Sequence, residues 1–225
     1  MSKKEEIKHD ELEKVESVLT ATEAFIEKYQ KQILIGVGTI VLVVLVVLSF
    51  RNFYLQPREV LAQNEMYKSQ TAFATDSFKL ALEGNGVESI GFKEISSEYG
   101  FTESGKLAAA YAGICYYKLG QFETAIDYLS KYSGKDGYFS TSVQGLIGDC
   151  YVELNETEKA VKYFEKAVSA NNEILSPVYL KKAALVYESL KELDKAEKNY
   201  LTIKEKFPKS TEAADVEKYI ARVQK

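Results

Sequence analysis

Few residues in the sequence could support catalysis. The only histidine is His9, in a polar segment near the N-terminus, and the two cysteines are Cys115 and Cys150. A histidine-based triad or metal cluster needs several such groups in one folded domain, and the rest of the chain has no histidine to contribute. The glycine-rich stretch 84–86 lacks the lysine and hydroxyl residues of a phosphate-binding loop. The sequence therefore predicts a non-enzymatic protein with no catalytic, cofactor-binding or metal site.

The two cysteines occupy equivalent places in segments that resemble each other. Cys115 directly precedes Tyr116, and Cys150 directly precedes Tyr151. If the two segments form neighbouring helices, the helix axes lie about 8–10 Å apart. Such a separation is beyond the usual reach of a disulfide. We expect buried free thiols, and a disulfide is the alternative.

The composition indicates one modest soluble domain behind an apolar segment. The chain has 225 residues and a formal net charge of −4, with its lysines and arginines dispersed along the sequence. No basic patch of the kind that binds nucleic acid is present. Residues 58–225 are long enough to bury a single hydrophobic core.

The longest apolar run extends from Ile33 to Phe50 and contains no charged residue or proline. About twenty apolar residues in a helix cross the ~30 Å core of a bilayer, and a lone span must be helical to satisfy its backbone. Arg51, Phe53 and Tyr54 follow and suit the headgroup level. We predict a transmembrane signal anchor over residues 33–54. The alternative, a buried strand, is disfavoured because strands usually have about 3–10 residues.

A cleaved signal peptide is a second alternative for this run. Its apolar core would have about 7–15 residues and would end at small residues, whereas this run ends at Ser49, Phe50 and Arg51. An uncleaved N-terminal anchor usually leaves its short tail inside the cell and exports the large domain. We therefore expect residues 1–32 to be cytoplasmic, although lysine and arginine differ little between the two flanks.

The N-terminal tail itself contains an amphipathic pattern. Apolar residues recur at helical spacing, and glutamates occupy most of the other face. The apolar positions are Leu12, Val15, Leu19, Thr22, Ile26 and Tyr29. The interpretations are an interfacial helix, a docking helix for a cytoplasmic partner, or a solvated helix that runs into the span.

Three segments of the soluble part align on an alanine. The alanines are Ala125, Ala160 and Ala196, which recur every 35 or 36 residues. Each segment has a small residue, an aromatic residue, a turn, the alanine and a second large residue in the same order. The other matched positions are Gly113, Tyr116, Gly120, Phe122 and Leu129, then Gly148, Tyr151, Asn155, Thr157, Phe164 and Ala167, then Ala184, Tyr187, Lys191, Leu193, Tyr200 and Pro208. The pattern resembles the tetratricopeptide repeat (TPR), two antiparallel helices in about 34 residues.

This resemblance implies an all-α fold, a TPR-type α-solenoid behind the single N-terminal transmembrane helix. We expect a leading helical hairpin over residues 55–105, then three repeats and a capping helix over residues 106–225. The leading part would contain a long helix from Arg58 to Leu82 and a short one from Phe92 to Tyr99. The capping helix would run from Thr211 to Val223.

Side-chain sizes in the repeats agree with paired helices. Gly113, Gly148 and Ala184 fall where the first helix of a unit crosses the second, and a larger side chain would hold the two apart. The aromatic residues that follow are predicted to pack as wedges between hairpins. They are Tyr116, Tyr151 and Tyr187.

The first helix of each unit lines the inner groove of known tetratricopeptide repeats, so the resemblance also indicates a partner-binding groove. Its candidate residues are Leu107, Ile114, Tyr117, Asp149, Val152, Lys181, Leu185 and Glu188. Repeats that clamp a C-terminal carboxylate use lysines and an asparagine here. This groove has one lysine, Lys181, beside Asp149 and Glu188, and is otherwise largely apolar. The alternative is that some of these residues only pack against a neighbouring helix.

The whole layout resembles the YfgM-like proteins, which have a short cytoplasmic tail, one anchor and a few exported repeats. Residues 80–86, 91–100 and 103–129 resemble the join between leading hairpin and repeats in that family. The resemblance implies a bacterial inner-membrane protein whose C-terminal domain is periplasmic. Its implied partners are the SecYEG translocon and PpiD, a membrane-anchored periplasmic chaperone.

Two other functions remain open from the sequence. The first is a cell-envelope scaffold for an outer-membrane assembly or secretion complex. The second is a regulatory subunit that brings substrates to a separate enzyme. The identity of the bound partner distinguishes all three functions.

Overall fold

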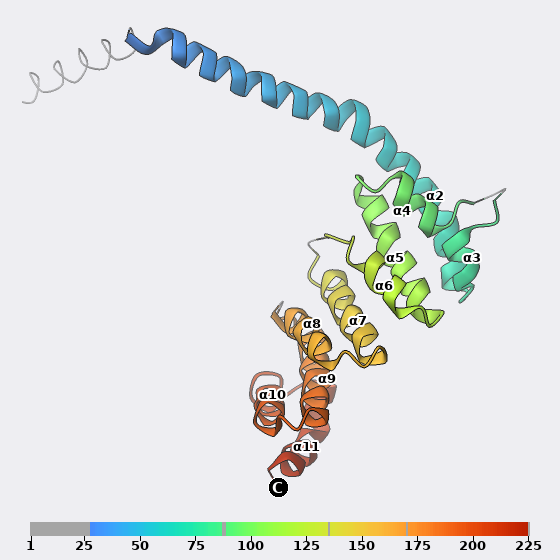
Figure 1. The fold of residues 1–225 in the computed structure, drawn as a ribbon, viewed down its shortest axis with the longest axis vertical. Helices are drawn as coiled ribbons and strands as arrows, with labels where there is room; N and C mark the ends of the chain where they lie inside the picture. Colours follow the sequence, from blue (N-terminus) through green and yellow to red (C-terminus); the bar gives the residue numbers. More distant parts are fainter. Residues whose placement is uncertain (1–27, 87–88, 135, 170, 225) are drawn as a thin grey trace, which may run out of the picture. The chain divides into compact units, whose positions relative to one another are not determined.

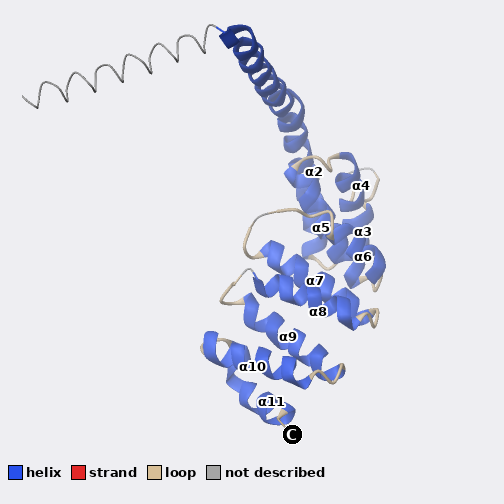
Figure 2. Ribbon diagram, turned by 60° about the vertical axis from the view of Figure 1, so that its left-hand side comes forward, coloured by secondary structure: helices blue, strands red, loops and turns tan. Residues whose placement is uncertain are grey.

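The computed structural model describes residues 28–86, 89–134, 136–169 and 171–224. Helices joined by turns and loops account for this part of the chain, and its isolated antiparallel bridge between Gly84 and Ile90 belongs to no strand (Figures 1 and 2). The chain divides into two compact units, Met1–Tyr54 and Leu55–Lys225. The predicted amphipathic pattern from Leu12 to Ile26 lies outside the described residues.

The described part of the first unit is an apolar helix. Residues 28–49 are α-helical and continue into η1, a π-helical segment from Phe50 to Leu55. The helix is long and apolar enough to cross a membrane, and none of its most apolar window is buried. A helix without a partner for such side chains is a candidate membrane span. The anchor predicted from the sequence falls within it.

The second unit begins with α2, Gln56–Ala74, which has Pro57 in its first turn. Proline is tolerated there because the first N–H groups of a helix have no internal partner. Ala62, Met66 and Ser69 are buried on one side of α2. The helix packs against α3, α4 and α5, the helices that follow it in the chain.

The single helix predicted from Arg58 to Leu82 is wrong, because α2 ends at Ala74 and α3, Phe78–Glu83, begins after a turn. Asp76 has a left-handed backbone with φ +55°. The Thr75 hydroxyl and the Ser77 N–H each donate a hydrogen bond of 3.0 Å to the Ala72 carbonyl. These bonds satisfy carbonyls at the end of α2 and reverse the chain.

The short helix predicted near residues 92–99 is confirmed as α4, Phe92–Glu98. The chain approaches α3 closely just before it: a Cβ atom on Gly91 would lie 2.1 Å from the Leu82 carbonyl oxygen, so only glycine fits. The described residues between 56 and 102 therefore form three helices, α2, α3 and α4, rather than the two of a simple hairpin.

Three helical hairpins follow, and each helix packs chiefly against its neighbours in the chain. This nearest-neighbour packing is typical of a solenoid. We call the initial helix of each hairpin its first helix. The pairs are α5, Glu103–Lys118, with α6, Phe122–Leu129; α7, Phe139–Glu153, with α8, Thr157–Ser169; and α9, Leu175–Ser189, with α10, Leu193–Lys206 (Figure 1).

The turn inside each hairpin has the same geometry. Gly120, Asn155 and Lys191 occupy equivalent positions and have φ values of +74°, +59° and +60°. In each turn the next residue's N–H donates to a tyrosine carbonyl five residues back, at 2.8–2.9 Å. This is the left-handed cap that commonly ends a helix. The turn positions matched in the sequence are confirmed.

Close helix contacts form at the predicted small residues. Ala125, Ala160 and Ala196 are completely buried. A Cβ atom on Gly148 would lie 2.6 Å from Cε1 of Phe164, and one on Gly113 would lie 2.6 Å from Cγ of Leu129. Such separations are too short for carbon atoms in contact. The repeat alignment therefore identified where the paired helices meet.

The tyrosines after these small residues make contacts both within a hairpin and with the preceding one. The Tyr116 ring lies 5.1 Å from that of Tyr128, and the Tyr151 ring lies 5.3 Å from that of Tyr163. Both ring contacts lie within one hairpin rather than between hairpins. The Tyr187 hydroxyl, in contrast, donates a 2.8 Å hydrogen bond to Glu165 of the preceding hairpin.

Both cysteines are buried and free. Burial raises the pKa of each thiol to about 12. A thiol that stays protonated is a poor nucleophile. Cys115 and Cys150 therefore behave as small core residues of their helices.

The chain ends in the predicted capping helix, whose first turn is a 3₁₀ helix. η2 spans Thr211–Asp215 and α11 spans Val216–Val223. The Ser210 hydroxyl accepts a 3.2 Å hydrogen bond from the Ala213 N–H at its start. Val216, Ile220 and Val223 are buried, while the charged residues between them stay outside. An apolar inner face and a polar outer face are what a solenoid cap requires.

Candidate functional site

The candidate groove residues lie on the three first helices, α5, α7 and α9. In the repeat alignment they form two rows, Ile114–Asp149–Leu185 and Tyr117–Val152–Glu188, with Leu107 and Lys181 nearer the starts of their helices. Leu107, Ile114 and Tyr117 are half-buried against the core that extends from α2 to α7. The alternative of simple packing thus holds in part for α5.

Accessible apolar surface remains at three of these positions. Val152 is 39% exposed and Leu185 is 43% exposed. Tyr117 is half-buried and stands edge-on to Phe122, with 5.7 Å between ring centres. We call Tyr117, Val152 and Leu185 the apolar track. Its members come from consecutive first helices, so a ligand along the track would contact all three hairpins.

The pKa of the Tyr117 hydroxyl is affected by the charges around it. Burial, and then the carboxylates of Asp149 and Glu153 on α7, raise the pKa of its hydroxyl. A raised pKa keeps the phenol protonated, and a protonated phenol is a hydrogen-bond donor. The Tyr117 ring can therefore offer apolar area and a donor to the same partner.

The charged candidates are already paired inside the domain. Asp149 accepts hydrogen bonds of 2.7 and 2.8 Å from Lys182, which connect α7 with α9. Lys181 instead donates to Asp215 of η2 at 2.9 Å. Asp149 therefore pairs with Lys182 and not with Lys181, the one lysine among the candidate groove residues.

Burial raises the pKa of Asp149 above its ordinary value, although the hydrogen bond and charge of Lys182 act in the opposite direction. The carboxylate therefore depends on its lysine to stay ionised. An ion pair of this kind is a positioning element between helices and has little capacity left for a ligand.

The carboxylate of Glu188 is likewise hydrogen-bonded within the domain. Its Oε1 accepts a 2.5 Å hydrogen bond from the Tyr200 hydroxyl of α10 and a 2.6 Å hydrogen bond from Arg222 of α11. The third hairpin and the cap are thus joined by Lys181–Asp215 and Glu188–Arg222. A carboxylate clamp built on free lysines does not match this arrangement.

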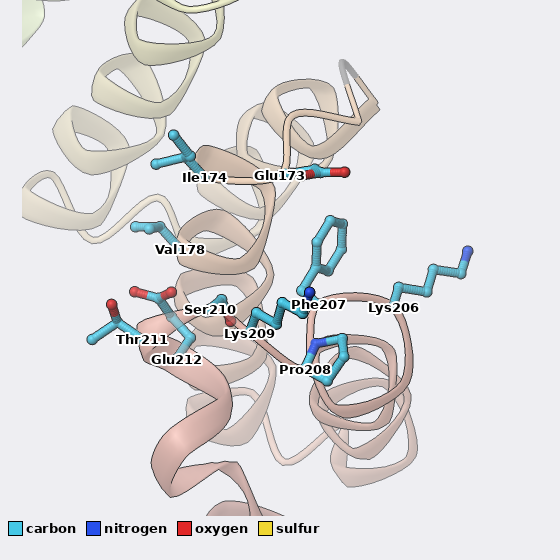
Figure 3. Close-up of a pocket in the computed structure, with 10 residues that line it drawn as sticks. All are labelled: Glu173, Ile174, Val178, Lys206, Phe207, Pro208, Lys209, Ser210, Thr211 and Glu212. Carbon is cyan, nitrogen blue, oxygen red and sulfur yellow. The ribbon is translucent and has the colours of Figure 1, made fainter.

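A separate cavity opens at the start of α9 (Figure 3). Its volume is about 620 Å³, and it lies between the beginning of α9 and the connector from α10 to η2. Its apolar lining is Ile174, Val178, Phe207 and Pro208, and charged residues at its border are Glu173, Lys206, Lys209 and Glu212. Sequence reasoning missed this cavity. The path of the connector creates it, and no sequence motif encodes that path.

Within the described ranges, no group of three or more histidine, cysteine, aspartate or glutamate side chains could hold a metal ion. Among the titratable residues with shifted pKa values, Glu59, Asp149 and Asp215 each pair with a residue of another helix.

Comparisons with known proteins agree with this geometry. Tetratricopeptide repeat family patterns match residues 141–174 (TPR_8) and residues 111–135 and 180–210 (TPR_6). These ranges fall on the three hairpins. A search of curated protein sequences returned no match.

Solved structures with a similar fold include MamA, at 18% identity and a TM-score of 0.50, with 69% of this chain and 92% of MamA covered. TPR-like repeats of a Podosopora anserina protein described as a kinesin light chain align at 14% identity and a TM-score of 0.49. That alignment covers 75% of this chain and 84% of the other. At 18% sequence identity, the similarity to MamA is evidence for the fold only.

The fold and the matched patterns define an all-α protein with a TPR-type solenoid. The chain contains tetratricopeptide repeats, and a helix that is a candidate membrane span precedes them. Such repeats are typically scaffolds that bind other proteins, so protein partners are the expected ligands.

Proposed function

We propose that this chain is a non-enzymatic interaction protein tethered to a membrane, and that the apolar track is its partner-binding surface. The observation that carries the proposal is the exposure of Val152 and Leu185 beside Tyr117 on consecutive first helices. A track of this kind suits an apolar segment of a partner protein laid along a helical groove. Tyrosine is a frequent hot-spot residue at interfaces, so Tyr117 is the expected anchor.

The tether places this surface on one side of the membrane. Residues 33–54 form the proposed anchor, residues 1–32 the cytoplasmic tail, and the solenoid a periplasmic domain at the bacterial inner membrane. The exposed apolar helix before α2 supports the anchor. The cytoplasmic location of the tail rests on the usual arrangement of N-terminal signal anchors. A cysteine at Ser2 labelled in intact cells by a membrane-impermeant thiol reagent, with one at Lys225 unlabelled, would refute this topology.

The proposed partners are a SecYEG-type translocon and a PpiD-like anchored chaperone. The resemblance of the layout to YfgM-like proteins supports them. In this role the solenoid would assist the passage of emerging proteins from the translocon to periplasmic chaperones. A tethered domain has a high effective concentration near a membrane-embedded partner, so a modest groove affinity suffices.

Purification in mild detergent, followed by partner identification, tests this function. The full-length chain is compared with a Tyr117→Ala/Leu185→Ala variant and with Leu193→Ala. Leu193 is 41% exposed and lies outside the track, so it is matched to Leu185 in size and exposure. We expect translocon and chaperone subunits with the wild type and Leu193→Ala, and several-fold less with the double variant.

Other outcomes would contradict separate parts of the proposal: the partner, the binding surface or the interaction role. Specific recovery of outer-membrane assembly or secretion components in place of the translocon would assign the chain to a scaffold of that machine. Equal recovery with the double variant, folded by circular dichroism, would exclude the apolar track as the binding surface. Absence of specific partners from all three samples would reject the interaction role.

A further inference from the structure

Glu153 is the last residue of α7 and follows Val152 of the apolar track. Its side chain is exposed, and no ion pair or hydrogen bond joins it to another residue that the structure describes. Asp149, the other carboxylate of α7, is engaged in its ion pair with Lys182. Glu153 therefore leaves an uncompensated negative charge at the edge of the track.

Local electrostatics disfavour a glutamate at this position. The C-terminus of a helix carries a partial negative charge, so lysine or arginine is favoured in the last turn. The last turn of α7 has no basic residue, whereas the equivalent position at the end of α5 is Lys118. Glu153 also follows Asp149 by four residues, a spacing at which like charges destabilise a helix. Stability of the fold therefore does not account for a carboxylate here.

The same carboxylate is near enough to the track to act on Tyr117. Burial, and then the charges of Asp149 and Glu153, raise the pKa of the Tyr117 hydroxyl, and no lysine or arginine of the described ranges opposes this shift. Because Asp149 is paired with Lys182, Glu153 supplies the net charge of this part of the surface. A cation brought by a ligand would meet this carboxylate without displacing an existing ion pair.

We propose that the apolar track binds a partner segment in which a lysine or arginine lies close to the apolar residues, and that Glu153 determines specificity by binding this cation. The proposal rests on the proposed function of the track. The apolar side chains of the segment cover Tyr117, Val152 and Leu185, and the cation reaches Glu153 at the border of the contact. An acidic segment would bring a like charge to the same place, which lowers its affinity.

The exposure of Glu153 limits the size of its effect. An ion pair at the border of an interface contributes more to specificity and association rate than to affinity, and exposed ion pairs are individually weak. The apolar track therefore supplies most of the affinity, and Glu153 selects among apolar segments. Its removal should reduce partner binding several-fold, and high salt should diminish the difference because it screens exposed charges.

Photo-cross-linking from Leu185 of the full-length chain in native membranes tests the cation contact. The photoreactive phenylalanine analogue at Leu185 is combined with Glu153→Gln, with Glu153→Lys or with the control Glu205→Lys. Glu205 is a matched control because it is an exposed glutamate in the last turn of a helix, α10, that does not carry the track. We expect several-fold less adduct with Glu153→Gln, less again with Glu153→Lys, and the unmodified yield with Glu205→Lys.

The adduct also identifies the chemistry of the partner segment. Mass spectrometry of the adduct formed with Glu153 intact should find lysine or arginine within about four residues of the attached residue, which is a reach of ~13 Å in an extended segment. A segment without such a residue would refute the proposed ligand class.

Thermal unfolding of the purified full-length variants separates a binding role from a structural one. Because the end of α7 disfavours a negative charge, Glu153→Gln and Glu153→Lys should melt at or above the wild-type temperature. A lower melting temperature for Glu153→Gln would make the glutamate a structural residue and overturn the proposal.

The adduct yields distinguish this proposal from the proposed function. Equal yields with Glu153→Lys and with Glu153 intact would overturn the cation contact and leave the track as the binding surface. An equal loss with Glu205→Lys would show a general effect of charge and likewise overturn it. No adduct from Leu185 in any variant would refute the track itself, and the cation contact with it.

Discussion

Glu59 caps the N-terminus of a helix that begins more than forty residues later, through its contacts with Ser104. Its carboxylate accepts hydrogen bonds from the Ser104 hydroxyl at 2.6 Å and from the Ser104 N–H at 3.1 Å. Ser104 lies in the first turn of α5, where N–H groups lack internal partners and a negative charge is favourable. The Thr102 hydroxyl accepts from the Gly105 N–H in the same turn. The leading helix α2 is thereby fastened to the first repeat.

Replacing Glu59 with glutamine should lower the free energy of unfolding by about 1 kcal/mol at neutral pH. Burial alone would raise the pKa of Glu59, but hydrogen bonds from Ser104 and Gln63 lower it overall from 4.5. A carboxylate with a lowered folded-state pKa stabilises the fold above its unfolded pKa and loses that contribution as the pH falls through the folded-state pKa. Urea unfolding should show the Glu59→Gln difference at pH 7 and its decline below about pH 4.5.

A suitable control is Glu65→Gln on the same helix, because Glu65 forms an i,i+3 pair with Lys68 at the surface. Such pairs contribute little, so this variant should stay near wild type. A Glu59→Gln effect that is as large at pH 3.5 as at pH 7 would argue against the charge-dependent cap.

The close contact at Gly148 limits the size of the side chain that this position can accept. Gly148→Leu should destabilise the soluble unit by about 1–3 kcal/mol or more, because the new side chain would meet the Phe164 ring. Ala160→Leu, at a completely buried site, should behave similarly. Lys162→Leu on the exposed side of α8 should be nearly neutral. Thermal unfolding monitored by circular dichroism tests the three, and equal melting temperatures would contradict the helix contacts.

Removing one partner of the Asp149–Lys182 ion pair should lower the free energy of unfolding. Lys182→Met leaves a largely buried carboxylate unpaired, so it should cost about 1 kcal/mol at pH 7. The pKa of Asp149 is already raised by burial and should rise further. An acid with a raised folded-state pKa weakens the fold where it is ionised, so the loss should shrink as the pH falls toward the unfolded value. Asp149→Asn/Lys182→Met should recover part of the loss at pH 7, and an additive double variant would show that the pair is not coupled.

Cys115 and Cys150 should be unreactive while the protein is folded. Both thiols are buried, and burial raises their pKa to about 12. An aromatic disulfide reagent at pH 8 should therefore react at the rate of unfolding, and both thiols should react at once in denaturant. Fast reaction of either thiol in the native protein would contradict its placement in the core.

The repeats could be predicted from the sequence because their signals are local and recur. A small residue, an aromatic residue, a left-handed turn and an alanine each report a steric requirement that any sequence with this fold must meet. Gly148 and Ala160 illustrate this, since their size alone indicates a close helix contact. The break between α2 and α3 was missed because it depends on Asp76 accepting a left-handed backbone, which aspartate permits but does not require.

The charged part of the groove was less predictable. Lys181 and Lys182 are adjacent in the sequence, and the rotation of α9 decides which of them reaches Asp149. That rotation follows from packing against α8 and the cap, which sequence spacing does not resolve. The roles of Asp215 and Arg222 as partners of the groove residues were missed for the same reason. The exposure of Val152 and Leu185 agrees with the predicted positions, whereas their role in binding stays a proposal.

Photo-cross-linking from single positions tests the central claim most directly. A photoreactive phenylalanine analogue is placed in the full-length chain at Val152 or Leu185 on the apolar track, or at Lys162 on the exposed side of α8. Illumination in intact cells should give one discrete adduct to the same partner protein from Val152 and Leu185, and none from Lys162. Tyr117→Ala should reduce the adduct from Val152 several-fold. Adducts from Lys162 alone, or equal adducts from all three positions, would show that the track does not bind the partner.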